Sequence, residues 1–403
     1  MLSFAIPRFL IISITLIHSV ISFAAADAPL LVQPASAKSL MPLSNDALSD
    51  STLKKIQEIK ITKQPTTSAQ NSTTYGGGYG GNELTSMLVY DGLPHHLAAF
   101  PVNRNDKKKL CFMENQDAGI YHYNFFGYLK LASYACPSAN QYHNGVFWNE
   151  RLDIRNGAYN IDNDALYAST MVNKMYMEWF GISTTQNLDG GPAPMQIVTH
   201  VSKLSDAQQQ GNKIILGDGD KNSYPFTSPG IISFMMGFIF TEQHSELDYN
   251  YPTSSGISLA FNSMADQAVK YYINGQNDWQ VGSNILKTGQ PLYYMDQPSK
   301  DCGARKPGDN CSIDHMSQYK SNIDPHFTSG VYRRALYLLA TTPDWDVKKT
   351  FSVMVQANRF YWTRKQSFTQ GVCGMIKAAR DLKYNETAII DAFDQVGIIS
   401  KNC

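Results

Sequence analysis

The residues with the clearest chemistry in this sequence are its six cysteines, the first of which is Cys111. In an exported chain an even number of cysteines indicates disulfide bonds, and six cysteines allow fifteen pairings. The simplest pairing joins neighbours in the sequence, because each bond then closes a short or moderate loop and stabilises the fold by about 2–4 kcal/mol. A cysteine metal site is not expected, because no CxxC pair occurs. The expected disulfides are Cys111–Cys136, Cys302–Cys311 and Cys373–Cys403.

Three other motifs that could carry chemistry are incomplete. Tyr75–Glu83 is rich in glycine but lacks the Lys-Ser/Thr ending of a phosphate-binding loop, so we interpret it as a hinge. The acids of Gly217–Asp220 could bind calcium, yet their spacing does not complete a twelve-residue calcium loop. His326 and Ser329 could suggest a serine hydrolase, but no G-x-S-x-G nucleophile motif supports one.

The N-terminus reads as an export signal over residues 1–26. Arg8 supplies the positive charge, Phe9–Phe23 the apolar region and Ala24–Ala26 the small residues of a cleavage site. The alternative is a transmembrane anchor, but the apolar region is short and ends in small residues. We therefore expect cleavage, no transmembrane anchor in the mature chain, and a secreted, extracellular or periplasmic protein.

The charge balance argues against some partners. The 34 basic residues equal the 34 acidic residues in number, whereas proteins that bind nucleic acid or anionic membranes favour basic patches. No nucleic-acid partner is therefore expected.

One stretch, Ser228–Asp278, organises the second half of the chain. Ser228 and Pro229 are a suitable N-cap and first-turn residue for a helix. Ile231–Phe240 is almost wholly apolar and too short to span a bilayer, so it predicts a buried central helix. A second helix is expected over Gly256–Tyr272.

The remaining pattern predicts an α+β protein. A leader or linker is expected over residues 27–74, with one short amphipathic helix at Leu53–Ile61. A β-rich lobe is expected over 75–227, built mostly of antiparallel strands with one helix near Ala165–Trp179. A helical lobe is expected over 228–403, with helices at Ser329–Leu339, Lys348–Arg359, Gly371–Leu382 and Thr387–Val396.

A series of short motifs, weak singly and strong in this order, resembles the thermolysin-like neutral metallopeptidases, most closely the pseudolysin (elastase) branch. The resemblance covers residues 75–403. It also implies an early and a C-terminal disulfide, which match the first and third expected pairs. The motifs are Asn156–Tyr159, Asn163–Ala165, Gly217–Gly219, Phe240–Gln243, Asn277–Asp278, Tyr294–Ser299, Ser317–Tyr319, Ser329–Tyr332, Tyr337–Ala340, Ala357–Trp362, Gly371–Gly374 and Ala392–Gly397.

The resemblance implies a two-lobed fold with a catalytic zinc between the lobes. Such a zinc takes two His of an HExxH helix and a Glu from the next helix, with the HExxH Glu as general base. At the two His positions this chain has Phe234 and Phe238, at the base position Met235, and at the third ligand position Leu259. Phe and Leu have no donor atom for zinc. A register shift to Thr241–Ser245 would give no His pair.

Other positions that the resemblance identifies also differ. The substrate-binding positions hold Asp206, Gln208, Gln209 and Tyr293, where the family has Asn, two aromatic residues and Arg. The calcium positions hold Gly230, Gln267 and Lys270, and only Asp278 is kept. The positions of the oxyanion-stabilising histidine, its partner and a neighbouring tyrosine keep His326, Asp324 and Tyr249, which we expect to be structural hydrogen-bonding residues.

These losses lead to a specific expectation about function. The sequence predicts a secreted, catalytically inactive homologue of the thermolysin-like metallopeptidases, a pseudopeptidase that is not an enzyme and has no zinc or calcium cofactor. Its expected role is to bind a peptide or a protein. The alternative is an active secreted zinc metalloendopeptidase.

Overall fold

The structure of the chain is a computed structural model that describes residues 71–76, 80–85, 100–124, 127–136, 155–187, 189–201, 204–401 and 403. All of these belong to one compact unit, Ala35–Cys403. The expected signal peptide and residues 27–70 of the expected leader, including its short helix, lie outside the described residues. Residues 71–74 were expected to belong to the linker but are part of a strand, Asn71–Gly76, that pairs with Phe100–Asn105.

The strands form two sheets and one two-stranded ribbon. A four-stranded antiparallel sheet has the order β1-β2-β3-β6, and a five-stranded sheet has the order β5-β4-β7-β9-β8. The strands are β1 (Asn71–Gly76), β2 (Phe100–Asn105), β3 (Leu110–Phe112), β4 (Ala118–Tyr123), β5 (Leu129–Leu131), β6 (Ser133–Ala135), β7 (Met195–Val201), β8 (Ala207–Gln210), β9 (Lys213–Gly217), β10 (Gln280–Val281) and β11 (Tyr293–Tyr294).

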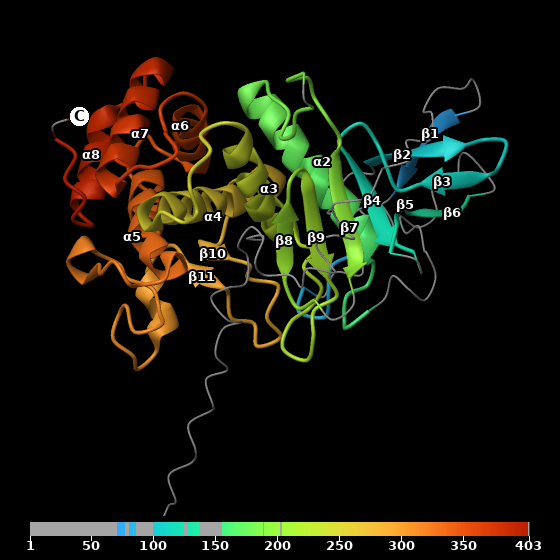
Figure 1. Ribbon diagram of the computed structural model, residues 1–403, viewed down its shortest axis with the longest axis horizontal. Coiled ribbons are helices and arrows are strands. Elements are labelled where there is room, and N and C mark those ends of the chain that lie inside the picture. The colour runs from blue at the N-terminus through green and yellow to red at the C-terminus, as the bar shows by residue number, and fades with distance from the viewer. Residues whose placement is uncertain are drawn as a thin grey trace, which may run out of the picture. The chain divides into compact units, whose positions relative to one another are not determined.

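Most strand pairs are antiparallel, as expected, but the centre of the five-stranded sheet is parallel. β4 pairs parallel with β7, and β7 pairs parallel with β9. After β4 the chain forms β5 and β6 and then returns to β7 through α2 (Ile161–Phe180). This helix packs on both β4 and β7 (Figure 1). Parallel neighbours require such a crossover, and a helix is its usual form. The expected helix near Ala165–Trp179 is this crossover.

The remaining helices confirm the helical second half of the chain. Each expected helix lies within or close to an observed one, and the ends differ by a few residues. The helices are α3 (Pro229–Gln243), α4 (Pro252–Asn274), α5 (Pro325–Ala340), α6 (Val347–Phe360), α7 (Phe368–Leu382) and α8 (Glu386–Asp394). The fold is therefore the expected one, with a β-rich N-terminal part and a helical C-terminal part.

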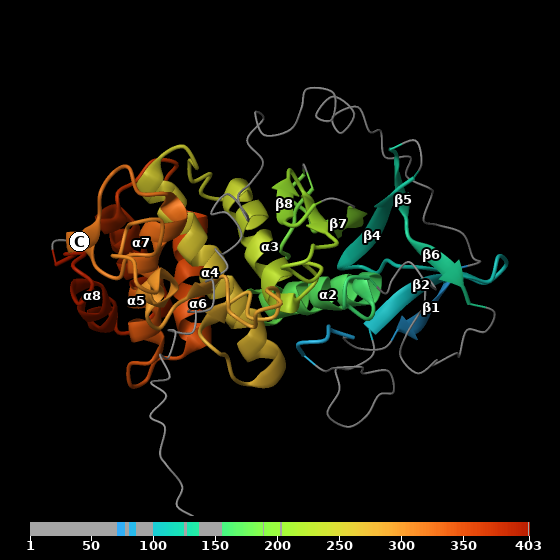
Figure 2. The same cartoon turned by 90° about the horizontal axis from the view of Figure 1, so that it is seen from below.

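The central helix α3 begins as the sequence predicts. The Ser228 hydroxyl accepts a hydrogen bond from the Ile231 N–H at 3.3 Å, and Pro229 occupies the first turn. The helix packs on α2 and β8 on one side and on α4 on the other, as the two perpendicular views show (Figures 1 and 2). Every residue of Ile231–Phe240 is buried, which explains why this stretch is apolar around its whole circumference.

All three disulfides form in the expected pairs. Cys111–Cys136 joins β3 to the end of β6, Cys302–Cys311 closes a short loop, and Cys373–Cys403 ties the last residue to α7. Among the described residues, no helix is both long and apolar enough to cross a membrane.

The burial of α3 makes a prediction about stability. Phe238 is fully buried, whereas Phe360 at the end of α6 is 57% exposed. We expect Phe238→Ala to lower the free energy of unfolding by about 3–5 kcal/mol, because it removes buried apolar surface and leaves a cavity.

Phe360→Ala is the matched control and should change the unfolding free energy by no more than about 0.5 kcal/mol. Urea denaturation of both variants and the parent measures the difference. Equal effects of the two substitutions would contradict the assignment of Phe238 to the core.

Candidate functional site

The positions at which the resemblance places a zinc lie where α3 faces α4. Phe234, Met235 and Phe238 are fully buried and Leu259 is 2% exposed. The rings of Phe234 and Phe238 meet edge to face with centroids 5.7 Å apart, and Phe238 meets Tyr249 at 5.5 Å. Apart from the weak thioether acceptor of Met235, the four positions offer no side-chain atom that could bind a metal.

Of the three residues that match the family, His326 and Asp324 lie together, and Tyr249 lies elsewhere. The His326 Nδ1 lies 2.8 Å from Asp324 Oδ1, and Asp324 also caps α5 by accepting the His326 N–H. The His326 side chain is 2% exposed, and its Nε2 makes no hydrogen bond within the described residues. Tyr249 instead packs on Phe238 and accepts a long hydrogen bond from the Ser258 hydroxyl at 3.4 Å. Burial raises the pKa of Tyr249, so its phenol stays protonated.

The side chain of Arg333 lies close to Tyr293, which occupies the position of the family's substrate-binding arginine. The Tyr293 ring stacks on His326 on one side, and the guanidinium of buried Arg333 lies 4.3 Å from the ring centroid. Arg333 donates to the Ser312 hydroxyl and to the His326 carbonyl. A positive charge therefore comes from α5 rather than from β11, a contact that the sequence did not predict.

The expected substrate-binding positions Asp206, Gln208 and Gln209 lie at or next to β8, an edge strand of the sheet. Gln209 is 4% exposed, and its side-chain amide donates to Glu242 of α3 at 2.7 Å. Its side chain thus joins the sheet to the central helix.

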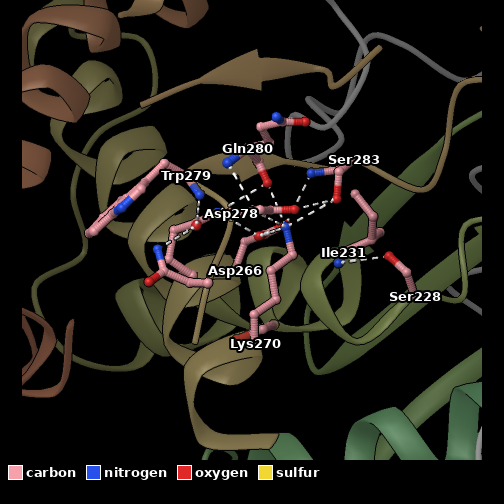
Figure 3. A network of polar contacts seen from close by, with 12 residues as sticks. Ser228, Ile231, Asp266, Lys270, Asp278, Trp279, Gln280 and Ser283 are labelled. Atoms are coloured by element: carbon pink, nitrogen blue, oxygen red, sulfur yellow. Dashed lines mark hydrogen bonds and ion pairs between the residues drawn. The ribbon is translucent and has the colours of Figure 1, made fainter. Parts of the chain in front are cut away.

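The expected calcium positions Gly230, Gln267, Lys270 and Asp278 lie around the buried carboxylate of Asp266. Figure 3 shows Lys270 and Asp278 beside Asp266. A side chain at position 230 would collide with that carboxylate, since a Cβ there would lie 2.4 Å from Asp266 Oδ2. Gln267 donates to Asp266 Oδ1 at 2.9 Å. The Lys270 Nζ lies 2.7 Å from Asp266 and 3.0 Å from Asp278.

This network joins α4 to the loop that follows it. Lys270 also donates to the Gln280 carbonyl, and Asp278 accepts from the Ser283 hydroxyl at 2.7 Å. Burial alone would lower the pKa of Lys270, but the two carboxylates raise it above its ordinary value. An ammonium group thus neutralises a carboxylate that is fully buried.

A different set of residues, in the β-rich part of the chain, forms a group of the kind that binds metal ions. His122 lies in β4, Asp162 in the first turn of α2 and His200 in β7. One donor atom of each residue lies within 4.8 Å of the donor atoms of the other two. The His122 Nε2 lies 2.7 Å from Asp162 Oδ2, and the His200 Nε2 lies 3.5 Å from Asp162 Oδ1. The two imidazole rings meet edge to face, 5.0 Å apart.

Hydrogen bonds fix the orientation of this group. The Thr199 hydroxyl donates to Asp162 Oδ1 at 2.6 Å, and the His200 Nδ1 lies 3.2 Å from Asp218 Oδ1. Burial alone would raise the pKa of Asp162, but the hydrogen bond and charge of His122 and the charge of His200 lower it below its ordinary value. The carboxylate is therefore ionised and available as a ligand.

Comparisons with known proteins agree with this architecture. Residues 96–241 match the catalytic domain of the thermolysin metallopeptidases, and residues 245–398 match the alpha-helical domain of the same family.

This chain belongs to the thermolysin metallopeptidase family.

Relatives with known names support this membership. The chain is 34% identical over 340 residues to a zinc metalloproteinase of Legionella pneumophila, covering 81% of this chain and 60% of the relative. It is 37% identical over 330 residues to the virulence metalloprotease of Vibrio anguillarum, covering 80% and 49%. The chain thus spans between about half and three fifths of the length of these two relatives.

A solved structure shares the fold. The precursor of protealysin, a metalloproteinase of Serratia proteamaculans, matches with a TM-score of 0.55 at 18% identity, covering 70% of this chain and 87% of that chain.

These findings correct two expectations from the sequence. The expectation that the chain is not an enzyme is wrong, because the family is one of metallopeptidases and the two named relatives are a zinc metalloproteinase and a metalloprotease. The expectation that it has no cofactor is wrong for the same reason, and because His122, Asp162 and His200 form a group that could hold a metal. The zinc ligand positions that the resemblance identifies lie on α3 and α4 alone, away from this group.

Sequence reasoning missed this group because its members carry no spacing motif. They lie on three elements, and only the parallel pairing of β4 with β7 brings both histidines to the same edge of the sheet. The sequence offered one signal, a histidine near the end of each of two strands. That signal indicates a shared site only if the two strands are known to run parallel.

The buried ion pair of Lys270 makes a second prediction. We expect Lys270→Met to lower the free energy of unfolding by about 3–5 kcal/mol, because it leaves the Asp266 carboxylate buried without its cation. Lys300→Met is the matched control, since Lys300 pairs with Asp296 near the surface with 43% of its side chain exposed. That substitution should cost less than about 1 kcal/mol.

Urea denaturation at neutral pH measures both variants. If Lys270→Met were no more costly than Lys300→Met, the network of Figure 3 would not be a stabilising one.

Proposed function

We propose that this chain is an exported, metal-dependent peptidase, the class of activity for which its named relatives are known. The proposal has two parts, recognition of a polypeptide and hydrolysis of it. The predicted signal peptide supports action outside the cytoplasm.

Recognition is supported by the geometry of β8. The Gly217 N–H donates to the Asp206 carbonyl, so in the antiparallel ladder with β9 these two residues form a hydrogen-bonded pair. The alternation of such a ladder directs the backbone groups of Ala207 and Gln209 away from β9, toward the outer edge of the sheet. The Ala207 N–H donates to the Asp206 carboxylate at 2.7 Å, so the groups that an added peptide would pair with are the Ala207 carbonyl and the backbone of Gln209. In the described part of the chain β9 is the one strand that pairs with β8. An extended peptide can add to such an edge through main-chain hydrogen bonds.

Hydrolysis is supported by the relatives and by the metal-binding type of the group at His122, Asp162 and His200. The residues of α3 and α4 do not fit a zinc, because Phe234, Phe238 and Leu259 have no donor atom. No chemical step is therefore derived at that position, and the proposal requires a metal held by other residues.

The test is an assay of the purified chain, without an affinity tag, on casein and on a fluorogenic peptide. We expect hydrolysis that a zinc chelator abolishes and added zinc restores. Absence of hydrolysis above the blank, with zinc present and the protein folded, would reject the peptidase part of the proposal.

Binding is measured separately with an inert peptide by fluorescence anisotropy. N-methylation of the backbone amides that pair with β8 should weaken binding about 5- to 30-fold, the equivalent of one or two hydrogen bonds of about 1 kcal/mol each. Peptide binding that N-methylation leaves unchanged would reject strand addition at β8.

A further inference from the structure

We propose that His122, Asp162 and His200 form a binding site for one divalent transition-metal ion, with zinc as the best match. The site lies in the β-rich part of the chain and uses none of the positions of α3 and α4 discussed above. It could supply the metal that the proposed function requires, but its test measures metal and not hydrolysis, so either proposal can fail alone.

The separations between the donor atoms suit a small ion. In a tetrahedral zinc site the metal–nitrogen and metal–oxygen distances are about 2.0–2.2 Å, which places neighbouring ligand atoms about 3.4 Å apart. The Asp162 carboxylate lies 2.7 Å from the His122 Nε2 and 3.5 Å from the His200 Nε2, and the largest separation within the group is below 4.8 Å. An ion would therefore require the separations between these donor atoms to change by no more than about 1.4 Å.

The backbone of β7 directs His200 into this group. The register between β7 and β9 shifts between Val198 and Val201, which marks a β-bulge. His200 lies within this bulge with φ +57°, a left-handed conformation that few residues other than glycine adopt. Bulges turn a side chain to a new direction and are frequent near functional sites. Here the turned side chain is the second imidazole of the group.

The residues around the ligands resemble the outer shell of a metal site. A ligating histidine usually bonds a carboxylate through its other ring nitrogen, and His200 does so through Nδ1 to Asp218. Asp218 is fixed in turn by Arg155, whose Nη1 lies 3.0 Å away. The Thr199 hydroxyl holds the carboxylate of Asp162. These bonds leave Nε2 of His200 directed at Asp162.

Access to the group comes from the His122 side. The side chain of Asp162 is 2% exposed and that of His200 10%, whereas that of His122 is 22% exposed. Two imidazoles and one carboxylate are three protein ligands, which leaves the fourth position of a tetrahedral ion open to water. Imidazole nitrogen with a carboxylate suits zinc better than calcium or magnesium, which prefer oxygen ligands alone.

The experiment is metal titration of the tag-free, chelator-treated chain by calorimetry with zinc chloride, followed by elemental analysis after dialysis. We expect one zinc per chain. His122→Gln and His200→Gln should each abolish this binding, and His315→Gln, a histidine outside the group that hydrogen-bonds Ser317, should leave it unchanged. Asp218→Asn should weaken binding about 10- to 100-fold, because it removes the outer partner of His200.

Two results would overturn the site. One is a parent protein that binds no stoichiometric zinc, which would make the group an ordinary network of histidine–aspartate ion pairs. The other is full zinc binding by a His122→Gln or His200→Gln variant with the far-ultraviolet circular dichroism of the parent. If those variants do not fold, X-ray absorption of the zinc-loaded parent decides the matter, because the site requires two imidazole ligands and no sulfur.

Discussion

The parallel pairing of β4 with β7 is the constraint on which the polar chemistry of the β-rich part depends. Parallel strands end at the same edge of a sheet, so the residues that close β4 and β7 are neighbours. The crossover helix α2 must run back along the sheet, and its first turn therefore lies at that same edge. A carboxylate in the first turn of a helix is favoured by the helix dipole. One topological choice thus gathers His122, Asp162 and His200 from distant parts of the sequence.

A second constraint acts where the two parts of the fold meet. The central helix α3 contacts α2 and β8 on one side and α4 on the other, so every face of it is enclosed. An enclosed helix is stable only if its side chains are apolar or fully hydrogen-bonded. In this chain the enclosed positions 234, 235 and 238 are occupied by the apolar side chains of Phe, Met and Phe. The buried carboxylate of Asp266 on α4 is instead paired with Lys270.

The sequence predicted those parts of the fold that local rules determine. The cap at Ser228, the apolar run after it and the sequential disulfides follow from neighbouring residues, and all are observed. The direction of β4 relative to β7 depends on which distant strands pair, and no local pattern encodes it. Because the parallel pairing of β4 with β7 was not identified from the sequence, the metal-binding group could not be predicted. Arg333 beneath Tyr293 was missed for the same reason, since the two lie on different elements.

The close contact of α3 with α4 also limits how this sequence can change by single steps. A lone His or Glu introduced at position 234, 235, 238 or 259 would enter a buried, mainly apolar interface and would lower stability before any ligand set was complete. Gly237 tightens the restriction, because a Cβ there would lie 2.1 Å from the Asn262 side chain. Routes through sequence space that rebuild polar chemistry between these helices therefore cross a stability barrier.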